Sequence, residues 1–297
     1  MDPQVTAYLD RVAALGLPPT ADLTPVAARR QNEAAAAANF GPVEDVASVE
    51  DGTIAGVPVR TYDPRPGAGL PVLVYLHGGG WVVGSRDTHD GPCRAIANRV
   101  PCRVVSVDYR LAPEHPFPAA LDDAWAVSRE VLSGALGDVP VAIGGDSAGG
   151  NLSAVVARRA RDTGLAPALQ LLVYPVTDCD LDTGSYRRCA AGCGMSARDM
   201  EWYWHHYAGD GDRTDPDLSP LRAPSLAGVA PAHVVVCEHD VLHDEGAAYA
   251  ERLRAEGVPV TLREVPGMIH GYIRLAAHID RARELWDDCA GALRDAL

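Results

Sequence analysis

Short apolar runs alternate with segments of helical periodicity along most of the 297-residue chain. Two of the runs, 71–76 and 103–108, are almost continuously apolar, as in strands that are covered on both faces. Strands that alternate with helices predict a mostly parallel sheet with right-handed crossovers, flanked by helices. We expect strands at 46–50, 57–62, 71–76, 103–108, 139–143, 169–174, 233–237 and 258–265, the first two as an antiparallel pair, and helices at 120–132, 244–256 and 279–293.

Two further segments fall outside this alternation. Residues 1–42 are expected to form an N-terminal helical segment, in which Thr24-Pro25 is typical of an N-cap followed by a first-turn proline. An insertion at about 178–218 carries the aromatic run 202–207, whose rings either anchor a helix on the core or line a pocket. The sequence therefore predicts one α/β domain, residues 43–297, with two helical additions.

The composition argues against several classes of partner. A net charge of −14 and a pI near 5.0 disfavour nucleic acid and anionic membrane surfaces. No apolar stretch approaches the roughly 20 residues of a membrane span, and the first residues lack the pattern of a secretory signal. Seven cysteines without regular spacing favour a reducing, cytoplasmic location. Cys189 and Cys193 lack the second ligand pair that a metal site needs, so we expect no metal.

The segment Gly145–Gly149, with the sequence GDSAG, lies between an apolar run and a helix-compatible segment. A strand that turns sharply into a helix through G-x-S-x-G is typical of the nucleophile elbow of the α/β-hydrolases. The glycines leave room for a strained turn that projects the serine from the sheet. Ser147 is therefore the candidate nucleophile, and the N–H of Ala148 is an expected donor to the oxyanion.

A serine hydroxyl needs a base to take its proton and a third group to orient that base. In this fold the chain order is serine, acid, histidine. Asp240 fits the acid best, because Glu238 lies close to the end of a strand and Asp244 suits the start of the next helix. His270, beside Gly271 and after the last strand, is the expected base. Four other histidines are less well placed: His205, His206, His239 and His243.

A glycine-rich turn, His77-Gly78-Gly79-Gly80-Trp81, follows the strand 71–76 directly. Three consecutive glycines let the backbone turn its N–H groups inward without side chains in the way. Such donors stabilise the oxyanion of a tetrahedral intermediate, and the loss of one typically costs about 10²–10³ in rate. This turn is expected to supply them.

These motifs together resemble the hormone-sensitive-lipase-like carboxylesterases, the bacterial family IV esterases. The resemblance rests on HGGGW at 77–81, DYRLAPE at 108–114, GDSAGGN at 145–151, DVLHDEG at 240–246 and HGY at 270–272. It implies an α/β-hydrolase fold with a helical cap, and a catalytic triad of Ser147, Asp240 and His270. The oxyanion hole would consist of Gly79, Gly80 and the N–H of Ala148.

The resemblance implies a serine carboxylesterase that hydrolyses short-to-medium-chain acyl esters through an acyl-enzyme and without a cofactor. It places residues 1–42 and 178–218 over the pocket as a cap, and it makes a homodimer plausible. We expect four residues to contact the substrate: Trp81, Asp146, Tyr174 and Trp202. A small-metabolite deacetylase or amidase with the same triad stays open, as does acyl transfer to another alcohol. A non-catalytic binding protein on the same fold is the alternative from another class, although every triad position is filled.

Overall fold

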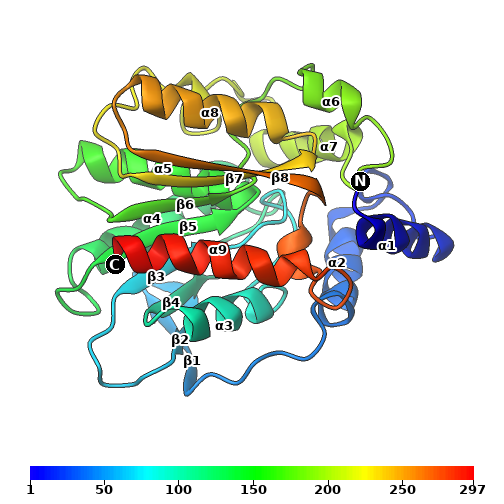
Figure 1. The fold of residues 1–297 in the computed structure, drawn as a ribbon. Coiled ribbons are helices and arrows are strands. Elements are labelled where there is room, and N and C mark those ends of the chain that lie inside the picture. The colour runs from blue at the N-terminus through cyan, green and yellow to red at the C-terminus, as the bar shows by residue number, and fades with distance from the viewer.

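A single eight-stranded sheet, in the order β1-β2-β4-β3-β5-β6-β7-β8, forms the centre of the computed structural model, which describes residues 1–297 (Figure 1). Its strands are β1 (Ser48–Ile54), β2 (Val57–Asp63), β3 (Val72–Leu76), β4 (Arg103–Val107), β5 (Val141–Asp146), β6 (Leu169–Val173), β7 (Ala232–His239) and β8 (Val260–Ile269). Strand β2 pairs antiparallel with β1 and β4, and every other pair is parallel. The predicted fold class and the antiparallel opening pair are confirmed.

Helices cover both faces of the sheet, so alternate residues of the central strands enter different cores. On β3, Leu73 and Tyr75 pack toward α3 (Asp90–Arg99) and α9 (Arg281–Ala296), whereas Val74 and Leu76 pack toward α4 (Ala119–Leu132) and α5 (Ala148–Asp162). A third cluster joins α8 (His243–Ala255) to the outer strands β6 and β7.

Helix α3 is the one element of the main alternation that the sequence pattern did not predict. It begins with Gly91 and Pro92 in its first turn, and its buried residues run almost without interruption from Gly91 to Ala97. Gly91 lies against the ring of Phe40, which leaves no room for a side chain there. Its apolar positions Cys93, Ile96, Ala97 and Val100 do recur at helical spacing, but the helix is short and its opening Gly-Pro pair is typical of a turn.

The helices outside the alternation gather at the end of the sheet where the parallel strands finish (Figure 1). They are α1 (Pro3–Ala14), α2 (Pro25–Phe40), α6 (Gly184–Arg188) and α7 (Ala197–Ala208). Thr24 caps α2 as expected, since its hydroxyl accepts the N–H of Ala27. No helix combines the length and the apolar character needed to cross a bilayer.

The N-terminal segment and the insertion contact each other directly. In the short 3-10 turn Thr20–Asp22, the N–H of Ala21 donates to Asp199 of α7 over 3.1 Å. Arg198 of α7 forms an ion pair with Asp22 in the same turn. The two segments therefore form one helical layer beside the carboxyl ends of the strands.

Glu245, in the first turn of α8, anchors the chain where it leaves β6 for the insertion. Its Oε1 accepts the N–H groups of Thr177, at 2.7 Å, and of Asp178, at 3.2 Å. Oε2 is buried and has no partner. Burial, which these N–H groups only partly offset, raises the pKa of Glu245 well above its usual range.

We expect Glu245→Gln to stabilise the protein at alkaline pH. In the unfolded chain this carboxyl ionises near its usual pKa of about 4.5, whereas the folded protein holds it neutral to higher pH. Stability from this group is therefore complete below about pH 4.5 and falls as the pH rises. Glutamine keeps the acceptor and removes the charge, so the free energy of unfolding at pH 8 should rise by at least about 1 kcal/mol.

Urea denaturation of both proteins at pH 5 and pH 8 measures this effect. The difference between them should grow with pH. A constant difference, or a larger one at pH 5, would contradict the assignment.

Candidate active site

Ser147 lies on a strained turn between β5 and α5. Its backbone has φ +56 and ψ −120, in a region that non-glycine residues rarely adopt. A Cβ on Gly145 or Gly149 would overlap the carbonyl oxygen of Leu76 at the end of β3. Only glycine therefore allows the elbow to pack this closely on its neighbouring strand.

Ser147, His270 and Asp240 form one hydrogen-bonded row, although 30 residues or more separate each from the next in the chain. His270 Nε2 lies 2.9 Å from Ser147 Oγ, and His270 Nδ1 lies 2.7 Å from Asp240 Oδ2. A carboxylate only accepts hydrogen bonds, so Nδ1–H donates to Asp240 and Nε2 is free to accept the hydroxyl proton. The other oxygen of Asp240 accepts the N–H of Leu242 at 2.9 Å, which fixes the buried carboxylate.

The competing acids have other partners. Glu238 accepts the N–H of Gly267 at 2.7 Å. Asp244 accepts the N–H of Ser185 at 2.7 Å and pairs with Arg188 of α6, so it holds the insertion and does not cap α8 as expected. His243 lies against Asp244 and His239 against Glu238. His205 and His206 lie on α7, with ring centres 5.3 Å apart.

The glycine turn after β3 lies against the elbow. A Cβ on Gly149 would come within 2.7 Å of the carbonyl oxygen of His77, so the two loops touch. Gly79 and Gly80 have φ +127 and +56, and the carbonyl of Gly79 accepts the N–H of Val83 at 2.9 Å. The N–H groups of Gly79, Gly80 and Ala148 donate to no acceptor within the protein. Three backbone donors beside the serine are thus available to a ligand.

Asp146 supports this glycine turn from behind. Its Oδ1 accepts the hydroxyl of Tyr75 at 2.8 Å and the N–H of Gly78 at 2.9 Å, and it lies 3.4 Å from His89 Nε2. Burial opposes ionisation of Asp146, but His89, Arg274 and Tyr75 outweigh it and lower the pKa of the carboxyl. Because Oδ1 of its carboxylate is engaged behind the turn, we infer that Asp146 positions Gly78, and its contact with substrate stays a prediction.

His77, the first residue of the turn, is also buried. Its Nδ1 lies 2.9 Å from the carbonyl of Gly78, and its ring stacks on Tyr109 at 4.2 Å between centres. The hydroxyl of Tyr109 donates to the carbonyl of His77 at 2.6 Å. Burial, followed by the neighbouring His89, lowers the pKa of His77 to about 3, so the ring is neutral.

Trp81 is fully buried, and its contact with substrate stays a prediction. Its ring stacks on Tyr207 at 4.4 Å and meets Trp204 at 4.9 Å, both on α7. Trp81 therefore fastens the glycine turn to the insertion. Trp204 and Tyr207, two of the four tryptophan and tyrosine residues in the run 202–207, are buried and anchor α7 on the core.

The two other expected contacts differ from each other. Tyr174 is 1% exposed and packs on the ring of His270, with 4.6 Å between ring centres. Its ring supports the position of the histidine, and its contact with substrate stays a prediction. Trp202 is partly exposed on α7 and meets Tyr203 and His206 edge to face, and its contact with substrate stays a prediction.

Tyr203 lies in the site, although sequence reasoning did not single it out. A Cβ on Gly80 would fall inside its ring, so the ring lies directly on Gly80. Burial raises the pKa of its phenol to about 12. The aromatic run was noticed in the sequence, but only the fold shows which of its rings reaches the glycine turn.

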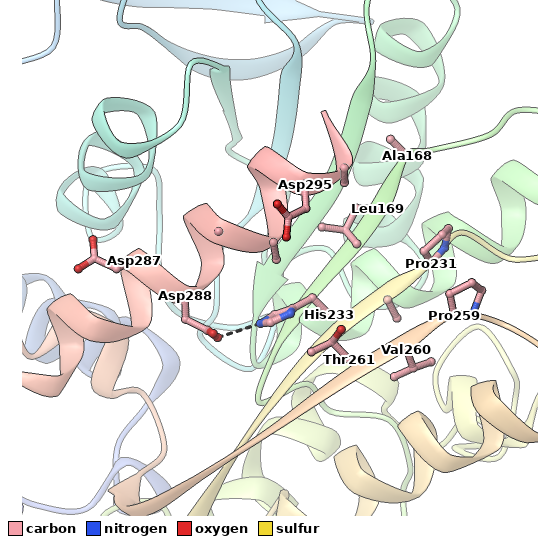
Figure 2. Close-up of a pocket in the computed structure, with 14 residues that line it drawn as sticks. Ala168, Leu169, Pro231, His233, Pro259, Val260, Thr261, Asp287, Asp288 and Asp295 are labelled. Carbon is pink, nitrogen blue, oxygen red and sulfur yellow. Dashed lines mark hydrogen bonds and ion pairs between the residues drawn. The ribbon is translucent and has the colours of Figure 1, made fainter.

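A large cavity lies far from these residues. Its volume is about 770 Å³, and it opens beside α9 and the amino ends of β7 and β8, where His233 pairs with Asp288 at 2.9 Å (Figure 2). The row of Ser147, His270 and Asp240 lies at the opposite, carboxyl end of the strands. Ser147 is only 6% exposed, so little of this residue is open to solvent in this structure.

Known proteins share this arrangement of sheet and helices. A family model described as alpha/beta hydrolase fold matches residues 73–274. The chain belongs to the α/β-hydrolase fold family. This α/β hydrolase is 45% identical to the carboxylic ester hydrolase LipN of Mycobacterium tuberculosis, over 84% of the chain and 70% of the relative. It is 36% identical to an ethyl acetate hydrolase of Pseudomonas putida, over 96% and 95%.

Among solved structures, the α/β hydrolase superimposes on a Ser161Ala mutant of LAE6, an enzyme from the metagenome of Lake Arreo, with a TM-score of 0.95. The two are 38% identical, and the match covers 99% of this chain and 98% of the other. The resemblance to the hormone-sensitive-lipase-like esterases is thereby confirmed. The protein is an α/β hydrolase of the group that contains these carboxylic ester hydrolases.

We expect Asp146→Asn to slow ester hydrolysis without removing substrate binding. Asparagine has one oxygen to accept the hydrogen bonds of Tyr75 and Gly78, and it lacks the negative charge that faces His89. We therefore expect the glycine turn to lose its fixed orientation. The kcat for p-nitrophenyl acetate should fall by about 10–100-fold, which is no more than the fall in kcat that the loss of one oxyanion donor causes. The KM should change by less than about threefold.

Asp45→Asn, on an exposed loop, is the matched control. Equal kinetics in Asp146→Asn and Asp45→Asn would contradict the positioning role. A rise in KM with kcat unchanged would support the substrate-contact interpretation.

Proposed function

We propose that the protein is a serine carboxylesterase in which Ser147 is the nucleophile, His270 the general base and acid, and Asp240 the group that orients the histidine. The observation that carries this proposal is the histidine bridge, 2.9 Å to the serine hydroxyl and 2.7 Å to the buried carboxylate. This is the geometry that activates a serine at neutral pH. The named activities of the relatives support ester bonds as the target.

The reaction follows from these contacts. Ser147 Oγ attacks the ester carbonyl while Nε2 of His270 takes its proton, and the imidazolium is stabilised by Asp240. The N–H groups of Gly79, Gly80 and Ala148 bind the oxyanion of the tetrahedral intermediate. His270 then protonates the leaving alcohol, which breaks the C–O bond and leaves the acyl group on Ser147. Water, deprotonated by the same histidine, releases the acid by the reverse steps.

In our proposal, the cap over this site consists of residues 1–42 and 178–218. Contacts between Ala21 and Asp199, and between Trp81 and α7, support a layer that is fastened to the glycine turn. The low exposure of Ser147 and the ring of Tyr203 on Gly80 favour small acyl groups. A homodimer and a cytoplasmic location stay predictions.

The proposal predicts that Ser147→Ala abolishes ester hydrolysis. Wild type and variant are compared on p-nitrophenyl esters from acetyl to palmitoyl, and wild-type kcat/KM should peak at short chains. Replacing the serine should lower kcat by at least about 10⁴-fold, because one missing triad member removes most of the catalysis.

Ser133→Ala, at an exposed serine, serves as the control and should match the wild type. Hydrolysis that survives in Ser147→Ala would refute the assigned nucleophile. A wild type inactive on every ester of the series would refute the esterase proposal.

Tyr203→Ala should shift the preference toward longer acyl chains. Removing a ring that covers Gly80 opens space beside the expected carbonyl position, whereas Tyr203→Phe keeps the ring and loses only the hydroxyl. The kcat/KM ratio of decanoyl to acetyl ester should rise by about tenfold in Tyr203→Ala, as about 1.4 kcal/mol of relief would give. An equal ratio in Tyr203→Ala and Tyr203→Phe would show that the ring does not limit chain length.

A further inference from the structure

Arg274 lies four residues after His270, in the short 3-10 turn Tyr272–Arg274 that directly follows the triad histidine. The turn is firmly held, because Tyr272 and Ile273 are buried and the carbonyl of Ile273 accepts the indole N–H of Trp286 at 3.0 Å. The backbone of Arg274 is therefore well fixed, and its side chain extends from a defined position next to the catalytic loop.

The guanidinium of Arg274 has no acidic partner. Its single hydrogen bond is a long one, 3.4 Å from Nη1 to the amide oxygen of Asn32 on α2, and its Nε is buried without a partner. Arg29, also partly buried, pairs with Glu114 at 2.5 Å, and Arg103, which has no acidic partner, donates to the carbonyls of Leu70 and Leu136. Arginine keeps its charge at physiological pH, and burying a charge without a counter-ion is costly. An anion from outside the protein would relieve that cost.

The positive charge of Arg274 acts on groups that surround Ser147. It helps to lower the pKa of Asp146, behind the glycine turn. It also counteracts the rise in the pKa of Tyr174, which packs on His270, and of Tyr203, which lies on Gly80. The acid among these, Asp146, is already engaged by Tyr75, Gly78 and His89. Arg274 thus lies between α2 and the triad with donors to spare.

We infer that Arg274 binds an anionic group of the substrate, so that the protein acts on esters that also carry a carboxylate. This inference rests on the proposed esterase function and specifies its substrate class. A guanidinium binds a carboxylate through two parallel hydrogen bonds, which neutral aliphatic esters cannot supply. The carboxylate would enter the space between the histidine turn and α2 while the ester carbonyl lies at the glycine turn.

The test compares half-esters with neutral diesters of the same acids. Monoethyl and diethyl malonate, succinate and glutarate differ in one carboxylate, and ethanol release measures both series. In the wild type, the kcat/KM ratio of half-ester to diester should exceed one at the best spacing. It should fall as NaCl is raised from 0.05 to 0.5 M, since salt screens charge attraction.

Arg274→Gln should lower this ratio at least tenfold, mainly through KM, and Arg274→Lys should recover part of it. Arg65→Gln, which removes an exposed arginine, is the charge-matched control and should keep the wild-type ratio.

An unchanged ratio in Arg274→Gln would overturn this inference alone. So would a wild-type ratio below one at every spacing while the diesters are cleaved. The wild-type ratio and its salt dependence decide the matter even where a variant does not fold. A wild type that cleaves neither series would instead refute the esterase proposal.

Discussion

The close contact between the elbow and the carboxyl end of β3 is the constraint on which the rest of the site depends. Gly145 and Gly149 lie so near the carbonyl of Leu76 that no side chain fits between them. Leu76 and Gly145 are also register partners in the parallel pair β3–β5. The sheet register therefore places the elbow and the glycine turn together, and the strained backbone of Ser147 is held by this packing.

Charges are arranged around that contact in two ways. Behind the glycine turn, the buried carboxylate of Asp146 is fully used and holds the backbone of Gly78. Helix α5 begins directly after Ser147, and its first N–H groups are free. The site therefore favours negative charge at this helix N-terminus. The unpaired Arg274 adds to this preference. A site for an oxyanion, and in our inference for a second anion, results within a protein of net charge −14.

The sequence allowed the fold and the three proposed triad positions to be predicted, because periodicity and motif order are local signals. All eight expected strands match within about two residues at their starts, and β8 continues to Ile269, directly before His270. Helix α3 was missed because it is short and begins with Gly91-Pro92, a pair typical of turns. The positions of the expected strand end and helix start separated Asp240 from Glu238 and Asp244. The structure shows that Glu238 accepts from Gly267 and Asp244 from Ser185, both distant in the chain.

Side-chain environments could not be predicted in the same way. Trp81 and Asp146 occupy motif positions next to expected catalytic groups, but the stack on Tyr207 and the bond to Tyr75 depend on packing between distant segments. Tyr203 and Arg274 belong to no chemical motif. Their place beside Gly80 and beside the histidine turn follows only from the way that the insertion and the last strand fold onto the sheet.

Covalent labelling tests the central claim, an activated serine at the elbow, most directly. The protein is incubated with diethyl p-nitrophenyl phosphate, and the site and stoichiometry of modification are determined by peptide mass mapping. We predict one diethylphosphoryl group per chain, on Ser147, with release of one equivalent of p-nitrophenol and loss of esterase activity in proportion. An unmodified Ser147 in fully folded protein, or a modification at another serine that accompanies inactivation, would contradict the account.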